Sequence, residues 1–542
     1  MDKRESADQS LAAYISLLRH NPKFRIVWIG ELVNSAGSWF NYVATLTLVE
    51  RLAGGSGLLL SLIIVIRFIP MLIFFPAAGV VADRYSRVDV LMHSCLLDAV
   101  VVAGLALVRR PQDAWLLYVL AFLQYTMAAF YDPARRALTP TIVPEHQLHL
   151  ATTLDSFSWS VMGAFGASLG GWAVSRLGTS ACFLLDAATY LVAAYCAFRL
   201  RGQVPPPGKH LDKERSGIDA NALESPKAPS PPAHPSTNPS YGSLSPSPKR
   251  RMSTHVDLRP SAAECKPHIG PDAAHVDESS TLQGHPDEVA DSVKGARGCC
   301  GAILHAFRDE INALHEGWAY ICSHHNRDVA VLVFIKACGS LTWGAADVLN
   351  VRFSEMPRMQ TLGDASTTLG FLFSSVGVGC FFGPIFFNKI TPPRLLYLLR
   401  SIAATFACFM LGYLLMMTAP SIAYVMLSTV LRSAGSSTIW VYSTLLLQLR
   451  VPNELQGRIM ALEMALFTVT DCVSSFFGGF AFDVLRMDVR RLSGVMAGVA
   501  AFFLVAWSIY AWQKWREAGG PGEGAYQRVS QTELTETGKE AV

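Results

Sequence analysis

The chain has 542 residues, of which 51% are hydrophobic and only 16% are charged. A soluble globular protein carries about 25% charged residues, so this composition excludes an ordinary soluble domain and indicates a membrane protein with many spans. The formal net charge of +3 is too small to indicate a nucleic-acid partner. Since the cysteines lack metal-ligand spacing and neither a nucleophile–base cluster nor a phosphate-binding loop stands out, we expect no metal, no cofactor, no catalytic residue and no enzymatic activity.

Apolar runs predict twelve membrane-spanning helices. Crossing a bilayer needs about 20 apolar residues, and a spanning segment must satisfy its backbone hydrogen bonds within itself. The first six predicted spans are residues 25–49, 58–82, 88–108, 114–135, 151–175 and 180–199. The second six are residues 328–351, 366–387, 395–417, 421–447, 458–482 and 492–512. The sequence therefore predicts an all-α membrane protein with two six-helix bundles, residues 25–201 and 328–513.

The segment between the two bundles has a different composition. Residues 202–298 are rich in proline, serine, histidine and charge, so they cannot bury a core and we expect a disordered cytosolic linker. Serines beside the basic residues 249–251 are either phosphorylation sites or part of a plain solvated linker. Residues 299–327 are amphipathic, which predicts a helix on the cytosolic membrane face. Residues 1–24 and 514–542 form the predicted tails.

Basic residues near the span ends indicate the orientation. With both termini in the cytosol, fifteen lysines and arginines flank the spans on the cytosolic side and nine lie on the outer side. Positive charge favours the cytosolic side of a membrane protein, so we expect both tails and the linker in the cytosol. The sequence leaves open whether the membrane is the plasma membrane or that of an organelle.

A repeat relates the two bundles. Val-Pro at residues 143–144 is followed 27 positions later by Gly-Gly at residues 170–171, and both dipeptides recur 308 residues further on with the same spacing. The same offset carries Asp155 onto Glu463. This pattern indicates that one half was duplicated into the other. Transporters built from two such parallel repeats bind their substrate between the halves, near the membrane midplane.

A charged turn lies between the second and third predicted spans. Gly79, Asp83, Arg84 and Arg87 stand at the spacing of the signature Gly-x-x-x-Asp-Arg-x-Gly-Arg-Arg, which resembles the major facilitator superfamily. Residues 86 and 88 depart from it, with Ser and Val in place of Gly and Arg.

Further stretches extend this resemblance over both bundles. Residues 130–144, 183–192 and 446–460 resemble the facilitator subgroup that contains enterobactin exporters and related drug exporters. The resemblance implies alternating access and efflux of a small organic solute by proton antiport. We expect a monomer in the lipid bilayer. Two alternatives stay open: an importer of a lysolipid, metal chelate or nutrient, and a transporter-like receptor or scaffold that signals through the linker and tail.

The charged turn is the predicted conformational switch. A carboxylate at a helix end can cap backbone N–H groups of a neighbouring helix and favour its dipole. The resemblance implies that Asp83 caps the eleventh span, which we expect to begin near Arg458, and so closes the cytosolic side. In the alternative interpretation, the arginines of the turn only set the topology.

A pair of acids forms a possible gate. Asp155 and Glu463 are expected within about the first turn of the fifth and eleventh spans, where the helix dipole favours an acid. Alternatively, they pair with Arg135, Arg136 or Arg450 in a symmetric gate.

The polar residues of the first, fourth, seventh and tenth spans are candidates for a substrate or proton cavity, since the resemblance implies that these helices line it. They are Asn34, Asn41, Gln124, Lys336, Asp347, Arg432 and Trp440. Ionisable groups are costly in hydrocarbon, so they pair or face water and often mark transport pathways. A structural pair or an interfacial position is the alternative for each. Glycines at residues 163, 166, 170 and 171 resemble an antiporter motif, and they also permit close helix packing.

Overall fold

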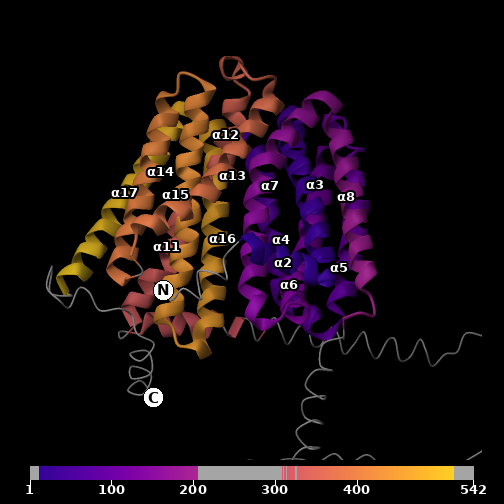
Figure 1. Ribbon diagram of the computed structural model, residues 1–542. Helices are drawn as coiled ribbons and strands as arrows, with labels where there is room; N and C mark the ends of the chain where they lie inside the picture. The colour runs from indigo at the N-terminus through magenta and orange to yellow at the C-terminus, as the bar shows by residue number, and fades with distance from the viewer. Residues whose placement is uncertain are drawn as a thin grey trace, which may run out of the picture. The chain divides into compact units, whose positions relative to one another are not determined.

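The computed structural model describes residues 11–204, 308, 311–312, 314–323, 326–392 and 394–517, whose regular secondary structure is helical (Figure 1). Nearly all of the predicted linker, most of the C-terminal tail and the first ten residues lie outside the described residues. Within the predicted amphipathic segment, the described residues 308, 311–312 and 314–322 are helical.

The helices follow the predicted spans closely. The N-terminal half contains α2 (Leu11–His20), α3 (Pro22–Ala53), α4 (Gly57–Arg84), α5 (Arg87–Leu105), η1 (Pro111–Asp113), α6 (Ala114–Ile142), η2 (Glu145–Gln147), α7 (Leu148–Leu177) and α8 (Thr179–Leu200). The C-terminal half contains α11 (Arg327–Trp343), α12 (Ala346–Ser354), η4 (Pro357–Met359), α13 (Ala365–Ile390), α14 (Leu395–Thr418), α15 (Ile422–Arg450), α16 (Asn453–Asp483) and α17 (Val489–Glu517). With α11 and α12 counted as one span, the predicted all-α fold of twelve spans is confirmed.

Two local features differ from the prediction. The N-terminal tail contains a helix, α2, whose Leu17 is buried in a small cluster with Phe24. The seventh span is broken between α11 and α12. At the break, a Cβ atom on Gly344 would lie 2.7 Å from the backbone oxygen of Asp471. The break therefore brings the backbone of the seventh span close to α16.

Nine helical segments in the described part of the chain are long and apolar enough to cross a membrane by composition alone. The other three spans are α3, α7 and α15. Helix α3 contains Asn34 and Asn41, and α15 contains Arg432, and all three side chains are buried. Helices α3 and α15 are less apolar because they direct these polar groups into the protein instead of the lipid.

The ends of the helices define two faces. Asn21 before α3 donates to the carbonyl oxygen of Ile142 at 2.7 Å, and Lys23 donates to that of Gln203 at 2.7 Å. We call this side, where α8 ends, the linker face. On the opposite side, Ser180 at the start of α8 donates to the carbonyl oxygen of Ala106 after α5 at 3.3 Å. We call this side the distal face.

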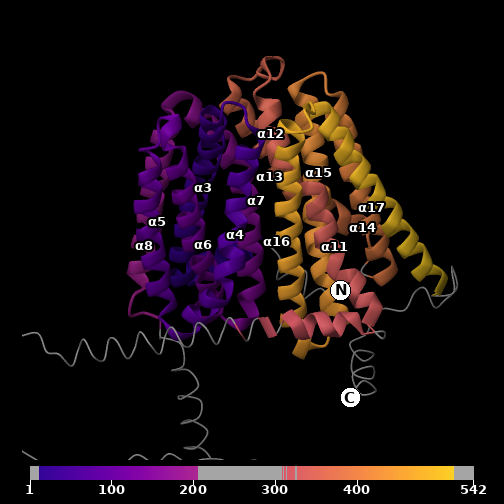
Figure 2. The same ribbon diagram turned by 180° about the vertical axis from the view of Figure 1, so that it is seen from behind.

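The two halves contact each other along α7 with α13 and along α4 with α16 (Figures 1 and 2). Glycines allow the first contact: a Cβ atom on Gly171 would lie 2.8 Å from the Cα atom of Gly370. On the same helix, Cβ atoms on Gly163 and Gly166 would lie 3.2 and 3.3 Å from the Trp39 side chain. The glycines of α7 thus permit close packing, as one of the two predictions for them states.

This crossing leads to a test of stability. We expect Gly171→Ala to lower the free energy of unfolding by about 1–3 kcal/mol, the usual cost of overpacking, because Gly370 is backbone and cannot move aside. Thermal unfolding of the purified protein measures the change. The matched control is Gly498→Ala in α17, where an added Cβ meets no described atom within 4 Å. Equal melting temperatures for both variants would contradict this explanation.

Candidate functional site

An ion pair joins the two halves at the distal face. Arg352 in α12 lies 2.5 Å from a carboxylate oxygen of Glu50 in α3, and it also donates to the carbonyl oxygen of Gly55 at 2.5 Å. The side chains of Arg352 and Glu50 are only 15% and 9% exposed. Such a shielded, charge-assisted contact is stronger than an exposed ion pair.

A second contact at this face is made by the last residue of α16. The carboxylate of Asp483 accepts hydrogen bonds from Ser56 Oγ at 2.6 Å, from Gly57 N at 2.7 Å and from Leu58 N at 3.0 Å. These donors belong to the N-cap and the first turn of α4, where backbone N–H groups have no partner within the helix. The C-terminal half thus caps a helix of the N-terminal half.

Below the distal face, aromatic rings and charges from both halves meet. The rings of Trp39 and Tyr42 from α3 contact Phe373 of α13, with centroids 6.4 and 5.1 Å apart. The Tyr42 hydroxyl donates to the carboxylate of Asp347, and the Arg67 guanidinium lies 4.6 Å from the centre of the Tyr42 ring. This layer adds a third contact between the halves.

A polar cluster lies inside the N-terminal half. The side-chain amide of Asn41 donates to Asp186 at 2.7 Å and to Gln124 at 3.4 Å, and all three side chains are buried. Asp98 is also buried, and its Oδ1 atom has no hydrogen-bond partner among the described residues. Asn34 is buried as well. The structure therefore joins Asn41 and Gln124, the candidates from the first and fourth spans, directly, and Asn41 also holds an acid of the sixth span.

A buried ion pair lies inside the C-terminal half. Lys336 in α11 is 2.8 Å from Glu463 in α16 and donates to Thr444 Oγ1 at 2.9 Å. The two charged side chains are 5% and 1% exposed. The Lys336 ammonium also lies 4.6 Å from the centre of the Trp440 ring, which is 44% exposed. This arrangement places a half-exposed aromatic face beside a fully shielded pair of charges.

The depth of this pair follows from helix geometry. Glu463 lies ten residues after the start of α16 at Asn453. At a rise of 1.5 Å per residue, this is about 15 Å along a helix of 31 residues. The Lys336–Glu463 pair therefore lies about a third of the way along α16 from its linker-face end.

Arg432 in α15 is fully buried. Its guanidinium donates to Asn350 Oδ1 at 3.3 Å and to Thr429 Oγ1 at 3.0 Å. It also lies 4.7 Å from the centre of the Tyr413 ring and 5.7 Å from that of Trp343. These partners all belong to the C-terminal half, so Arg432 is held within one bundle.

The two acids of the predicted gate have different partners. Asp155 accepts a hydrogen bond at 2.6 Å from Arg135, which is one of the predicted partners. Glu463 instead pairs with Lys336, so the prediction of an arginine partner for Glu463 is wrong. Arg136 is exposed. The acids also lie deeper than the first turn, because α7 begins at residue 148 and α16 at residue 453. Their positions are therefore explained by side-chain partners, not by a helix dipole.

Arg135 extends the Asp155 pair into a network on the linker side. Its Nε atom lies 3.6 Å from the carboxylate of Glu31, which also accepts a hydrogen bond from Tyr131 at 2.8 Å. This network joins α3, α6 and α7 within the N-terminal half.

The residues of the predicted switch lie on the linker face. Arg87 donates to the carbonyl oxygen of Ala137 at 3.0 Å, and Arg84 is exposed. The side chain of Asp83 lies outside the described part of the structure. Arg458 pairs with Glu316 of the amphipathic segment at 2.5 Å.

Glycines at the two ends of the α4–α16 pair have different surroundings. Around Cβ atoms on Gly79 and Gly457, near the linker face, no described atom lies within 4 Å. At the distal end of the same helix pair, a Cβ atom on Gly57 would lie 2.9 Å from the backbone oxygen of Gly479. In this conformation, α4 and α16 are therefore packed tightly at the distal face and more openly at the linker face.

Glu50, Tyr42 and Asp483 are not among the functional residues predicted from the sequence, and Arg352 is one of the nine basic residues expected on the outer side. One signal for Asp483 is present, because Gly479 and Asp483 repeat the spacing of Gly79 and Asp83. The partners of Glu50 and Tyr42 lie about 300 residues away along the chain, so no local pattern indicates them.

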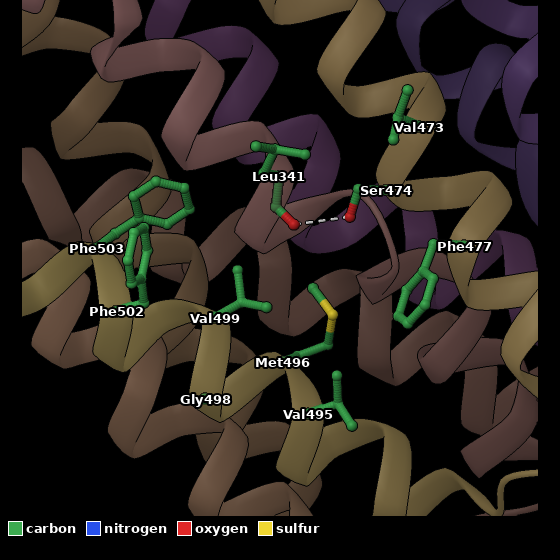
Figure 3. Close-up of a pocket in the computed structure, with 10 residues that line it drawn as sticks. All are labelled: Leu341, Val473, Ser474, Phe477, Val495, Met496, Gly498, Val499, Phe502 and Phe503. Carbon is green, nitrogen blue, oxygen red and sulfur yellow. Dashed lines mark hydrogen bonds between the residues drawn. The ribbon is translucent and has the colours of Figure 1, made fainter.

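An apolar cavity of about 590 Å³ lies in the C-terminal half (Figure 3). Its ten lining residues come from α11, α16 and α17, and the hydroxyl of Ser474 is turned toward the carbonyl oxygen of Leu341, to which it donates at 2.8 Å. Phe502 and Val473 on its wall are 67% and 56% exposed. Since a membrane protein meets acyl chains with such a surface, we do not assign the solute to this cavity. Among the described residues, no group of three His, Cys, Asp or Glu side chains is placed to hold a metal.

Comparison with known families decides the class of the protein. Residues 27–469 match the model of the Major Facilitator Superfamily. The chain belongs to the Major Facilitator Superfamily. It is a multi-pass membrane protein by family and by its apolar helices, and membership of this family indicates a transporter rather than an enzyme.

Relatives of known name include efflux proteins. Macrolide efflux protein A of Streptococcus pyogenes is 30% identical over 153 residues, which are 27% of this chain and 38% of that protein. The uncharacterized MFS-type transporter YfiS of Bacillus subtilis (strain 168) is 25% identical over 184 residues, 34% of this chain and 43% of that protein. The matched segments thus span less than half of these relatives.

Solved structures of POT family transporters share the fold. A POT family transporter in complex with 5-aminolevulinic acid has a TM-score of 0.59 at 11% identity, covering 90% of this chain and 96% of that one. An auto inhibited POT family peptide transporter has a TM-score of 0.57 at 14% identity, covering 91% of this chain and 97% of that one. At these identities, the likeness shows the fold alone.

Proposed function

We propose that this facilitator protein exports a small amphipathic organic solute by alternating access, as a monomer, in exchange for protons. The linker face is cytosolic, in agreement with the excess of basic residues on that side. The observation that carries the proposal is the buried Lys336–Glu463 pair beside the half-exposed ring of Trp440. Shielded charges inside a membrane-spanning bundle are costly and often mark transport pathways, and an aromatic face suits the apolar part of a solute.

The chemistry of export follows from this pair. In the distal-closed conformation, a solute enters from the cytosol and stacks on Trp440, while Lys336 holds Glu463 ionised. When the distal side opens, a proton from outside neutralises Glu463 and weakens its contact with Lys336. The solute leaves, and the proton is released on return to the cytosolic side. Efflux by the macrolide relative supports the direction, and no finer substrate identity is drawn from it.

Reconstituted protein tests the function. Proteoliposomes with an imposed pH gradient are assayed with a panel of amphipathic organic compounds that includes a macrolide, and flux is followed in both directions. We expect proton-driven movement of at least one compound toward the acidic compartment. Accumulation away from it would identify an importer. A full-length protein that moves no compound while its linker captures partners would favour the receptor or scaffold alternative.

The conformational switch makes a separate prediction. We expect Asp83→Asn to reduce transport several-fold while expression stays intact, because the neutral amide loses its charge interaction with the start of α16. Initial flux per mole of reconstituted protein measures this effect. The matched control is Asp89→Asn in the next helix, which loses the partly exposed pair with Arg201 at 3.0 Å and the acid in the first turn of α5, both within the N-terminal half. Wild-type flux in the Asp83 variant would contradict the switch.

A further inference from the structure

We propose that Asp483 is the distal counterpart of the switch at Asp83, and that α4 and α16 cap each other alternately at their two ends. This inference rests on the alternating access proposed above. It adds a positioning residue that acts on the opposite face of the membrane and on the same helix pair.

The first step of the argument is the chemistry of the cap. Both oxygens of Asp483 are used, since Oδ2 accepts from Ser56 Oγ and Leu58 N and Oδ1 accepts from Gly57 N. A carboxylate in front of the first turn of a helix satisfies orphan N–H groups and favours the positive end of the helix dipole. The acid belongs to one half and the helix to the other, so this bond exists only while the distal side is closed.

The second step is the geometry of the crossing. The carboxylate reaches α4 because Gly57 and Gly479 let the two backbones touch: a Cβ atom on Gly57 would lie 2.9 Å from the oxygen of Gly479 and 3.2 Å from its Cα atom. Asp483 follows Gly479 by four residues, which places both on one side of α16, one turn apart. Gly479 allows the two helices to come close together, and the hydrogen bonds of Asp483 stabilise this close contact.

The third step is the repeat of this pattern at the other end. Gly79 and Asp83 stand at the last turn of α4 with the same Gly-x-x-x-Asp spacing that Gly479 and Asp483 have at the last turn of α16. The start of α4 and the end of α16 meet at the distal face. Because both helices span the membrane, the end of α4 and the start of α16 lie at the linker face. There, a Cβ atom on Gly79 would meet no described atom within 4 Å, whereas a Cβ atom on Gly479 would overlap the backbone oxygen of Gly57. Each helix therefore ends with the same Gly-x-x-x-Asp pattern. In this conformation, the pattern of α16 contacts α4 at the distal face.

The consequence is a two-position lock. Opening the distal side must release Asp483 from α4, and closing the linker side lets Asp83 cap α16. Because one helix pair carries both contacts, the protein exchanges one cap for the other and does not pass through a state with neither partner satisfied. The two acids should then shift the conformational equilibrium in opposite directions.

Distance measurements between spin labels test this inference. One pair of labels, at residues 107 and 362, reports on the distal face, and a second, at residues 203 and 390, reports on the linker face of full-length protein with its other accessible cysteines replaced. We expect Asp483→Asn to raise the ratio of distal-open to distal-closed protein by about fivefold, the usual effect of losing a helix cap. An amide offers one acceptor oxygen and turns its NH₂ group toward an N–H donor, so it cannot replace the carboxylate. Asp83→Asn should shift the ratio the other way.

Further variants separate this role from a loss of folding. The double variant Asp83→Asn/Asp483→Asn should return the ratio toward that of the wild type, which a merely destabilised protein would not do. Ser56→Ala, which removes one donor, should act like Asp483→Asn but more weakly. The matched control is Asp488→Asn, which removes a carboxylate that accepts from Arg491 N at 2.7 Å within the C-terminal half and should leave the ratio unchanged.

Two results would overturn the inference, and they are distinguishable. If the wild type interconverts but Asp483→Asn leaves both distance distributions unchanged, or Asp488→Asn shifts them equally, the lock is wrong and the proposed function stands. If the wild type keeps a single conformation with and without a pH gradient, alternating access itself is wrong, and the lock with it.

Discussion

Replacing Lys336 by methionine is expected to abolish proton-driven transport and to lower the free energy of unfolding by about 3–5 kcal/mol. This is the usual cost of leaving one member of a buried ion pair without its partner, and Glu463 is only 1% exposed. Glu463→Gln should have an effect of similar size, because it leaves the Lys336 ammonium buried. Flux into proteoliposomes and thermal unfolding of the same preparations measure the two effects.

The double variant separates function from stability. In Lys336→Met/Glu463→Leu, neither charge is left uncompensated, so we expect most of the lost stability to return. Transport should stay absent, because the site has lost the group that binds the proton. The control is Lys389→Met on the exposed end of α13, which should change neither quantity. Proton-driven flux in the double variant would contradict the role of the pair.

Hydropathy predicted the twelve spans because it depends only on side chains that lie along one segment. The position of the break after Trp343 could not be predicted, because the sequence of the seventh span does not indicate that α16 approaches closely at Gly344. Helix α2 was overlooked for a related reason: its apolar residues are too few for a span, and they are buried against Phe24 and Leu150 of the same half.

Candidate residues were found more easily than their partners. A charged or amide side chain inside an apolar run is conspicuous, so Lys336, Asp347 and Arg432 were identified from the sequence. Partners depend on which helices become neighbours, and the repeat was misleading here. It aligned Glu463 with Asp155 and suggested arginine partners for both. In the structure, Glu463 is paired with Lys336 of α11. The counterpart of α11 in the first half is α3, and α3 provides an acid, Glu31, to the network around Asp155.

Contacts between the halves explain the rest of what the sequence does not reveal. The residues that close the distal face, Glu50 with Arg352 and Ser56 with Asp483, are separated by about 300 and 430 positions along the chain. Each lies at a helix end, where hydropathy places a charged residue at the water interface but does not indicate its partner. Only the folded arrangement shows that these interfacial charges hold the two bundles together on one side.

Reversing the charge of Arg352 is expected to open the distal face. In Arg352→Glu, two carboxylates would face each other where each is mostly shielded from water, so the distal-closed conformation is disfavoured. We expect the melting temperature to fall and reagents applied from the distal side to label a cysteine placed at Tyr42. Glu50→Arg should act in the same direction, because it brings two guanidinium groups together.

The swapped variant Glu50→Arg/Arg352→Glu restores the attraction with its polarity reversed. We expect it to recover most of the lost closure, with a coupling energy of roughly 0.5–3 kcal/mol from the double-mutant cycle. Recovery will be incomplete, because a glutamate at position 352 cannot donate to the carbonyl oxygen of Gly55 as the arginine does. The control is Arg358→Glu, an equal charge change at an exposed site on the same face. If that control opens the distal side as far as Arg352→Glu, then net charge at the surface, and not this ion pair, holds the two halves together there.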